Sequence, residues 1–582
     1  MFQDKPSIQS QLKFQCWQSI VIFIATSVIA LPANAQVDAG ALQQNLEQQL
    51  PLPSPLALPQ PGKPEPLQQT APKDGETRFV VKSFVVEGIN ILPEAQIQEV
   101  LRPWVSRSVN FDDLQKACDA VIDYYRKNGY TVQAILPPQK IANGIVKILV
   151  TEAKLSSVIV ETPQGPTRFS KDLAAKYITD VNPIGDYLNL AKVERALIIL
   201  NETPGVIVAS QLEPGANDGE TAIKMQLSDA PLVQGRGELN NYGSRTTGSN
   251  QATVAINLNN PSGFGDQGAI NGIASDGSAY IQGAYSLPAT NNGLRLGIAG
   301  TYLNYKNVSS YTSNNSGFGD AWTTGLTAAY PLIRSQGANL NTTMAYDIKS
   351  YMNKNQTSGS TISSYTINNL SFGMSGNKYD SLGGGAISTG SATVVLGNLA
   401  ISATSIQGYG TYTPTTFAKF NFSGSRNQQL TEDGLNSIYV ALSGQFASVN
   451  LNSAEQFYLG GPYGVRAYPV AQSPGSQGAL ATLELRRQLP QNLTLSAFYD
   501  WGAVQQYKAT FAGWQGQTNA NNTYSLMGAG FGLKWNYQNW NVAGSVAWMV
   551  GKNPLYNQYG QPTNTDGTTT QPRGWISASY SF

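Results

Sequence analysis

The chain is 582 residues long, so several domains are expected rather than one compact unit. Charged residues make up 13% of it, about half the share found in a soluble domain, whereas small polar residues and tyrosine are abundant. This balance is typical of a membrane barrel whose outer wall faces lipid and whose lumen is polar but largely uncharged. With a formal net charge of +1, the chain is not basic enough to favour nucleic-acid binding.

Several kinds of catalytic site lack their residues in this sequence. There is no histidine, which excludes histidine-based catalytic triads and histidine metal sites. Neither a G-x-S-x-G nucleophile motif nor a phosphate-binding G-x-x-x-x-G-K-[ST] motif occurs. We therefore expect no enzymatic activity, no cofactor and no bound metal.

Residues 1–35 have the features of a secretory signal peptide. Lys5 and Lys13 precede an apolar run at residues 20–31, and an A-x-A cleavage site follows at residues 33–35. The alternative, a membrane anchor, is weaker because the apolar run is too short to cross ~30 Å of hydrocarbon. Export without a helical anchor, in a chain rich in alternating strands, indicates the bacterial outer membrane.

Two unusual segments follow the signal peptide. Residues 36–50 predict a short polar helix, and its apolar stripe is too narrow to bury against a core; a disordered tail is the alternative. Residues 51–78 contain eight prolines and predict a semi-rigid linker that reaches up to ~85 Å at ~3.1 Å per residue. The apolar stripe of the helix predicted at residues 36–50 consists of Ala39, Leu42, Leu46 and Leu50.

Residues 79–153 and 154–229 predict two α+β units with the same order of elements: strand, helix, helix, strand, strand. In the first unit the strands are expected at residues 79–86, 130–136 and 144–152, with the longer helix starting at Asp112 and Asp113. The alternative to a repeated unit of one domain family is two generic α+β domains that happen to share this order of elements. Cys118 falls on the apolar face of the longer helix, and Cys16 leaves with the signal peptide. We therefore expect no internal disulfide and a buried Cys118 thiol.

From residue 230 to residue 582 every segment predicts a strand followed by a turn, about sixteen antiparallel strands in all. Apolar and polar residues alternate along residues 252–259. Trp540 and Trp548 lie ~19 Å apart along the membrane normal on a tilted strand, which roughly matches two aromatic girdles. The last strand ends with the aromatic residues Tyr580 and Phe582.

Two neighbouring segments of this region carry the most specific pattern. In residues 457–468, two glycines and a proline force a tight turn, and an arginine then sits among apolar and aromatic residues. The strand at residues 493–502 alternates, and its polar face carries a carboxylate. The loop residues are Gly460, Gly461, Pro462, Val465, Arg466 and Tyr468, and the strand residues are Phe498, Asp500 and Gly502.

These motifs resemble those of the two-partner secretion transporters, the haemolysin and filamentous haemagglutinin secretion and activation family of the Omp85 superfamily. Ala467 departs from the family pattern, which has glycine there; alanine fits unless the backbone needs a positive φ. The resemblance implies that the loop folds back into the pore and that Arg466 meets Asp500 on the lumen wall. In a water-filled lumen, this bond would contribute about 1 kcal/mol or a little more.

The resemblance also assigns roles to the other segments. Residues 36–50 would plug the pore, and residues 79–153 and 154–229 would be POTRA domains that bind unfolded substrate by adding it to a sheet edge. Tyr580 and Phe582 would form the signal read by the barrel-assembly machinery. The predicted fold is thus a transmembrane β-barrel preceded by two POTRA domains and a plug helix.

The implied function is transport of a large unfolded exoprotein from the periplasm to the cell surface without nucleotide hydrolysis. The expected partners are a secreted adhesin, haemolysin or contact-dependent toxin, outer-membrane lipid and the assembly machinery, with no nucleic acid. The alternatives are an assembly factor of the same superfamily, which typically has five POTRA domains, and a passive porin-like channel. A surface adhesin or barrel enzyme is a further alternative.

Overall fold

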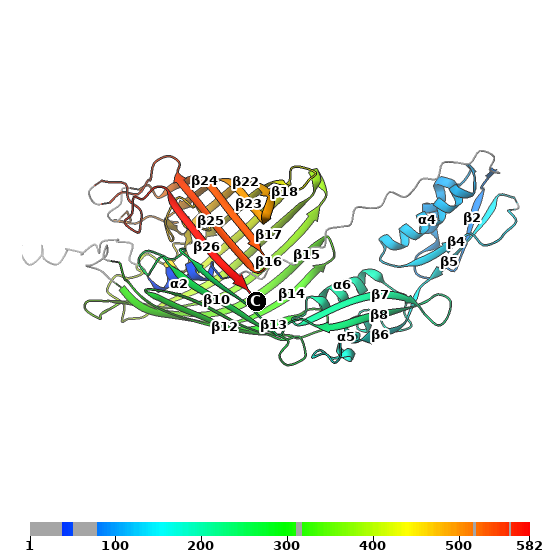
Figure 1. Ribbon diagram of the computed structural model, residues 1–582, viewed down its shortest axis with the longest axis horizontal. Coiled ribbons are helices and arrows are strands. Elements are labelled where there is room, and N and C mark those ends of the chain that lie inside the picture. The colour runs from blue at the N-terminus through cyan, green and yellow to red at the C-terminus, as the bar shows by residue number, and fades with distance from the viewer. Residues whose placement is uncertain (1–37, 51–77, 142, 310–316, 516–519, 558–559) are drawn as a thin grey trace, which may run out of the picture.

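The computed structural model describes residues 38–50, 78–141, 143–309, 317–515, 520–557 and 560–582. These residues form a short helix, two small α+β domains and a closed antiparallel barrel (Figure 1). The predicted signal peptide and nearly all of the predicted proline-rich linker lie outside the described residues. None of the helices in the described ranges is long and apolar enough to cross a membrane.

The first α+β domain has the predicted order of elements. In its three-stranded sheet, the central strand β5 runs parallel to β2 and antiparallel to β4. The long helix α4 starts at a capping box made by Asn110 and Asp113. The elements are β1 Phe79–Val80, β2 Ser83–Glu87, α3 Glu94–Leu101, η1 Arg102–Trp104, β3 Ser108–Val109, α4 Phe111–Lys127, β4 Val132–Ile135 and β5 Ile145–Glu152.

Cys118 lies on the buried face of α4, as predicted, and its side chain is fully shielded from solvent. Because burial disfavours the thiolate, it raises the pKa of the Cys118 thiol to about 11. The thiol is therefore part of the core of this domain rather than a reactive group.

The second α+β domain repeats the topology of the first, with the sheet order β6-β8-β7. Strand β6 runs parallel to β8, and β7 runs antiparallel to it. Within the described residues β7 pairs with β8 alone, so its other edge is open. The elements are β6 Lys154–Glu161, α5 Lys171–Thr179, α6 Leu190–Asn201, β7 Val206–Pro214 and β8 Glu220–Asp229.

Sixteen strands close the barrel, in agreement with the predicted number, and the last strand pairs with the first. The closing pair is short, with five paired positions from Ser577↔Asn240 to Ser581↔Arg236. The strands are β9 Val233–Asn240, β10 Gln251–Asn259, β11 Gln267–Ser275, β12 Ser278–Pro288, β13 Arg295–Lys306, β14 Gly317–Arg334, β15 Ala338–Asn355, β16 Thr361–Asp380, β17 Ala386–Ile401, β18 Thr416–Gln429, β19 Asn436–Ala447, β22 Gln477–Leu489, β23 Leu493–Gln505, β24 Thr523–Tyr537, β25 Trp540–Met549 and β26 Arg573–Ser581.

Side chains alternate between the outer wall and the lumen. In β13, Leu296 and Ile298 are exposed on the outside, whereas Leu303 and Tyr305 are buried on the inside. Trp540 and Trp548 are both exposed on the outer wall. The barrel therefore presents an apolar outer wall, as a lipid-facing barrel must.

The second α+β domain is docked on the turns at one end of the barrel (Figure 1). Arg334 Nε at the end of β14 lies 2.8 Å from the Glu202 carboxylate, and the Arg334 side chain is only 6% exposed. Arg195 on α6 donates a 2.6 Å hydrogen bond to the Pro331 carbonyl. These contacts hold the domain beside the barrel mouth, while the first domain lies farther from the barrel.

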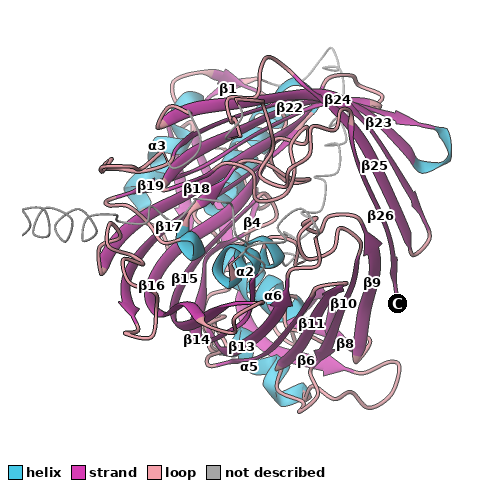
Figure 2. Cartoon of the chain, turned by 90° about the vertical axis from the view of Figure 1, so that its left-hand side faces the viewer, coloured by secondary structure: helices cyan, strands magenta, loops and turns pink. Residues whose placement is uncertain are grey.

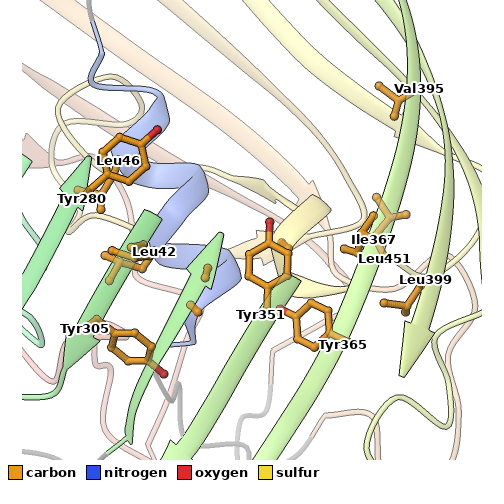
Figure 3. Packing of buried hydrophobic residues seen from close by; sticks show 14 of the residues in the cluster. Leu42, Leu46, Tyr280, Tyr305, Tyr351, Tyr365, Ile367, Val395, Leu399 and Leu451 are labelled. Carbon is orange, nitrogen blue, oxygen red and sulfur yellow. The ribbon is translucent and has the colours of Figure 1, made fainter. Parts of the chain in front are cut away.

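Helix α2 Ala39–Glu47 lies inside the barrel, surrounded by its strands (Figure 2). Leu42 and Leu46 pack among inward-facing tyrosines of the wall, including Tyr280 and Tyr305 (Figure 3). The expectation that the apolar stripe is too narrow to bury was wrong. The lumen supplies an apolar seat for the stripe and hydrogen-bond partners for the polar residues on either side of it.

Polar side-chain and backbone groups of α2 form hydrogen bonds to three neighbouring strands, β13, β14 and β15. Gln43 Nε2 donates to the Thr323 hydroxyl at 2.8 Å and to the Thr301 hydroxyl at 3.2 Å. The Ala39 amide donates to Asn353 Oδ1 at 2.8 Å. A short helix that would be marginal in water is therefore held by the barrel wall.

Replacement of Glu202 by alanine is expected to release the second α+β domain from the barrel. Arg334 would remain buried without its carboxylate, at a cost of roughly 3–5 kcal/mol. Limited proteolysis at residues 229–233 would measure the release. Asp218→Ala, at an exposed position in the same domain, is the control; equal cleavage of the two variants would show that the ion pair does not hold the domain.

Candidate functional site

The loop between the eleventh and twelfth strands, residues 448–476, turns into the barrel; we call it the lumen loop. A short antiparallel ladder pairs β20 Phe457–Tyr458 with β21 Pro474–Gly475 and brings its two arms together. Val465 and Tyr468 are fully buried between these arms and the wall. The lumen loop is therefore part of the barrel interior, packed against the wall.

The turn at Gly460, Gly461 and Pro462 reverses the lumen loop at its tip. Gly461 has a φ of 116°, which favours glycine, and a Cβ at Gly460 would lie 2.3 Å from the Pro469 carbonyl oxygen. The Val465 amide returns to bond the Leu459 carbonyl at 2.7 Å. This tight turn delivers Arg466 to the wall.

Arg466 is bound to Asp500 on β23 by three hydrogen bonds. Its Nε and Nη2 donate to the two carboxylate oxygens at 2.8 Å each, and its backbone amide donates at 3.1 Å. Asp500 is 1% exposed, and Thr482 also donates to it. The structure thus brings together the arginine and the carboxylate that the two sequence motifs predicted to meet.

Two further residues hold Arg466 and were not recognised in the sequence. Arg466 Nη1 donates to the Glu484 carboxylate at 2.7 Å, and Trp575 Nε1 on β26 donates to the Arg466 carbonyl at 2.8 Å. Glu484 on β22 lies opposite Phe498, two residues from Thr482, which is opposite Asp500. Alternation in β22 could have placed Glu484 on the lumen face, but only the strand register shows that it reaches Arg466.

Phe498 and Gly502 flank Asp500 on the lumen face of β23. The Arg466 guanidinium carbon lies 3.3 Å from the Phe498 ring centroid, a cation–π contact. A Cβ at Gly502 would lie 3.2 Å from a Val465 methyl group. The ring covers the charge, and the glycine leaves space for the loop.

Ala467 fits the loop without strain. It is not among the residues with a positive φ, and it is fully buried. Its Cβ points at Gly528 on β24, where an added Cβ would lie only 2.8 Å away. Because Gly528 has no side chain, the wall leaves space there for the Ala467 methyl group.

The burial of these groups corrects the expectation of a weak bond in a wet lumen. The side chains of Arg466 and Asp500 are 13% and 1% exposed, so the screening of an exposed ion pair does not apply. Loss of one partner would leave a buried charge unpaired, which typically costs roughly 3–5 kcal/mol.

A polar cavity of about 440 Å³ lies below the tip of the lumen loop, toward the barrel end that carries the α+β domains. Pro462 and Arg466 border it from above, and Arg486 and Lys534 line its wall. Arg486 is bound to Glu484 and stacks over Tyr439. The lumen is therefore hollow on one side of the loop tip and filled on the other by the loop and α2.

Tyr580 and Phe582 lie on the outer side of the closing seam. The Phe582 backbone exchanges two 2.9 Å hydrogen bonds with Gly235 near the start of β9. The Tyr580 ring contacts Trp540 at a centroid distance of 5.1 Å, and the Phe582 side chain is 59% exposed. Both aromatic side chains are thus available on the wall rather than in the lumen.

Comparison with known proteins places this architecture in a family. Residues 219–535 match the family described as haemolysin secretion/activation protein ShlB/FhaC/HecB, and residues 79–153 match the ShlB-type POTRA domain. The heme/hemopexin transporter protein HuxB of Haemophilus influenzae is 26% identical over 537 residues, covering 88% of this chain and 91% of that protein. The outer membrane transporter CdiB of Escherichia coli is 27% identical over 475 residues, covering 78% and 76%.

Two solved structures share the fold. CdiB from Escherichia coli superposes with a TM-score of 0.69 at 19% identity, over 94% of this chain and 99% of that one. CdiB from Acinetobacter baumannii gives a TM-score of 0.64 at 17% identity, over 93% and 96%. At this identity the likeness concerns the fold alone.

Replacement of Arg466 by alanine is expected to lower the stability of the folded barrel by roughly 3–5 kcal/mol, because the buried Asp500 carboxylate would lose its ion pair and Glu484 would keep only Arg486. Lysine should be intermediate, since an ammonium cannot bridge both carboxylates. Thermal unfolding of the purified protein, followed by gel mobility without boiling, measures the loss. Arg487→Ala, at an exposed position on the outer face of β22, is the control. Equal thermal unfolding midpoints for Arg466→Ala and Arg487→Ala would show that Arg466 does not anchor the lumen loop.

Enlarging Ala467 should also loosen the loop. Valine would press two methyl groups toward Gly528 and cost about 1–3 kcal/mol, whereas Ala467→Gly should cost about 1 kcal/mol or less. The same unfolding measurement compares them with Ala497→Val on the outer wall. A valine variant as stable as this control would mean that Ala467 does not fill the space at Gly528.

Proposed function

This chain belongs to the haemolysin secretion/activation family of outer-membrane transporters, and we propose that it is the pore of a two-partner secretion system. Its cargo is a large exoprotein that arrives unfolded in the periplasm and is moved to the cell surface. We assign residues 79–153 and 154–229 to two POTRA domains, residues 230–582 to the barrel and residues 36–50 to a plug. The observation that carries the proposal is a closed barrel that is filled by its own helix and loop and has two α+β domains at one end, the second of them docked on the barrel turns.

The open edge of β7 in the second POTRA domain is the proposed docking strand. A groove of about 420 Å³ runs between β7 and α6, with Val193 and Leu197 on the helix side and Val208 and Leu212 on the strand side. An extended segment added to β7 would form main-chain hydrogen bonds and place alternate side chains in this groove. Gln336, in a periplasmic turn of the barrel, also borders the groove, so the bound segment would lie near the pore entrance.

Transport then requires displacement of the two fillers of the lumen. The cavity below Pro462 would receive the chain first, and exchange of the Arg466 bonds with the moving polypeptide would open the remaining path. The sequence has no phosphate-binding motif, so folding of the exoprotein outside the cell is the proposed source of direction.

This arrangement favours a protein transporter over a passive porin, because a porin keeps a water-filled channel open at rest. We also propose that Tyr580 and Phe582 serve as the assembly signal, since both aromatic side chains are exposed on the wall beside the closing seam.

Co-expression with a large candidate exoprotein from the same genome tests the proposal. The exoprotein should appear in the medium with the intact chain, and Arg466→Ala should lower its amount by roughly tenfold or more, because the loop loses the anchor that positions it. Barrel insertion is measured in parallel by the unboiled gel mobility, and Arg487→Ala is the matched control. Normal secretion by an inserted Arg466→Ala variant would contradict the role of the loop. No secretion by the intact chain would contradict the proposed cargo.

A further inference from the structure

A second buried ion cluster lies in the lumen, at the other end of the lumen loop from Arg466. It is centred on Glu455, the last residue of the short helical turn η4 Ser453–Glu455, and Glu455 is only 2% exposed. Its Oε1 accepts from Lys349 Nζ on β15 at 3.0 Å and from Asn369 Nδ2 on β16 at 2.8 Å. Its Oε2 lies 2.7 Å from Lys419 Nζ on β18.

The Glu455 backbone is held as firmly as its side chain. Its carbonyl accepts from Lys419 Nζ at 3.1 Å and from Gln445 Nε2 at 2.9 Å. Four barrel strands therefore converge on one residue of the loop, and a carboxylate this deeply buried is tolerated because it is fully paired. Replacing it would leave two lysines facing the lumen with no carboxylate between them.

The turn that Glu455 anchors is also the seat of the plug helix. A Cβ at Gly40 would lie 2.6 Å from the Ala454 Cβ, so helix and turn are in close contact there. Gln44 Nε2 donates to the Gln456 carbonyl at 2.7 Å. The residues immediately before and after Glu455 thus contact α2.

We propose that Glu455 is a positioning residue for the plug helix: its ion cluster fixes η4 to the wall, and η4 holds α2 in the lumen. The barrel has two separate latches on the lumen loop. Arg466 ties the tip to β22 and β23, and Glu455 ties the entry arm to β15, β16, β18 and β19. Release of the Glu455 latch frees the helix, whereas the Arg466 latch controls the tip.

Solvent labelling of the plug helix tests this inference. Ala39, which is fully buried against the wall, is replaced by cysteine in a full-length Cys118→Ala background, and its reaction with a charged, water-soluble maleimide is timed. Glu455→Gln should speed labelling roughly tenfold, because the helix leaves its seat more often once the buried ions are unpaired. Glu432→Gln, at an exposed turn position, is the matched control.

A second variant separates a latch from general damage. Lys419→Met removes the wall side of the same ion pair and should also speed labelling, and the double variant should be no faster than the faster single one. The proposal would be overturned if folded Glu455→Gln is labelled at a rate within about twofold of the parent. It would also be overturned if the rate increase in the double variant equals the product of the two single increases. If Glu455→Gln does not insert, the Lys419→Met rate decides alone. No exoprotein is present, so the result is independent of secretion.

Discussion

Closure of the sixteen-stranded sheet is the constraint on which the rest of the structure depends. A strand edge in lipid would leave backbone groups unpaired, so β26 must return to β9 and enclose a lumen. The enclosed space is wide enough to admit a helix and a loop, and its wall offers them apolar side chains as well as polar ones such as Thr301, Thr323 and Asn353. An idle transporter must fill this space, and α2 and the lumen loop do so.

Both fillers pack against the wall and are also held by directional polar contacts. Arg466 is shared by two carboxylates, and Glu455 is shared by two lysines, each inside a region from which water is largely excluded. Such buried clusters are strong only while every partner is present, because an unpaired buried charge is costly. This makes them suitable as latches: an intact set of partners keeps the lumen closed, and the loss or exchange of one partner loosens it.

The docked second α+β domain is connected to the same part of the barrel. Its buried contact through Glu202 and Arg334 fixes the domain on the turn after β14, and β14 is one of the strands that bind the plug helix through Gln43. The open β7 edge is thereby held near the entrance of the barrel. In the proposed function, capture of substrate and opening of the pore would therefore take place on adjoining parts of one scaffold.

The sequence alone determined the number of strands and the shared face of Phe498 and Asp500, because a period of two residues sorts the side chains of a strand to one wall or the other. The position of Arg466 in the lumen was implied by the resemblance to the family and not by strand alternation. The sequence also indicated a helix near residues 36–50. Only the tertiary structure decided where that helix sits and which groups meet it. Glu455 and Lys349 are 106 residues apart, and such pairings depend on strand register and barrel closure, which local pattern does not encode.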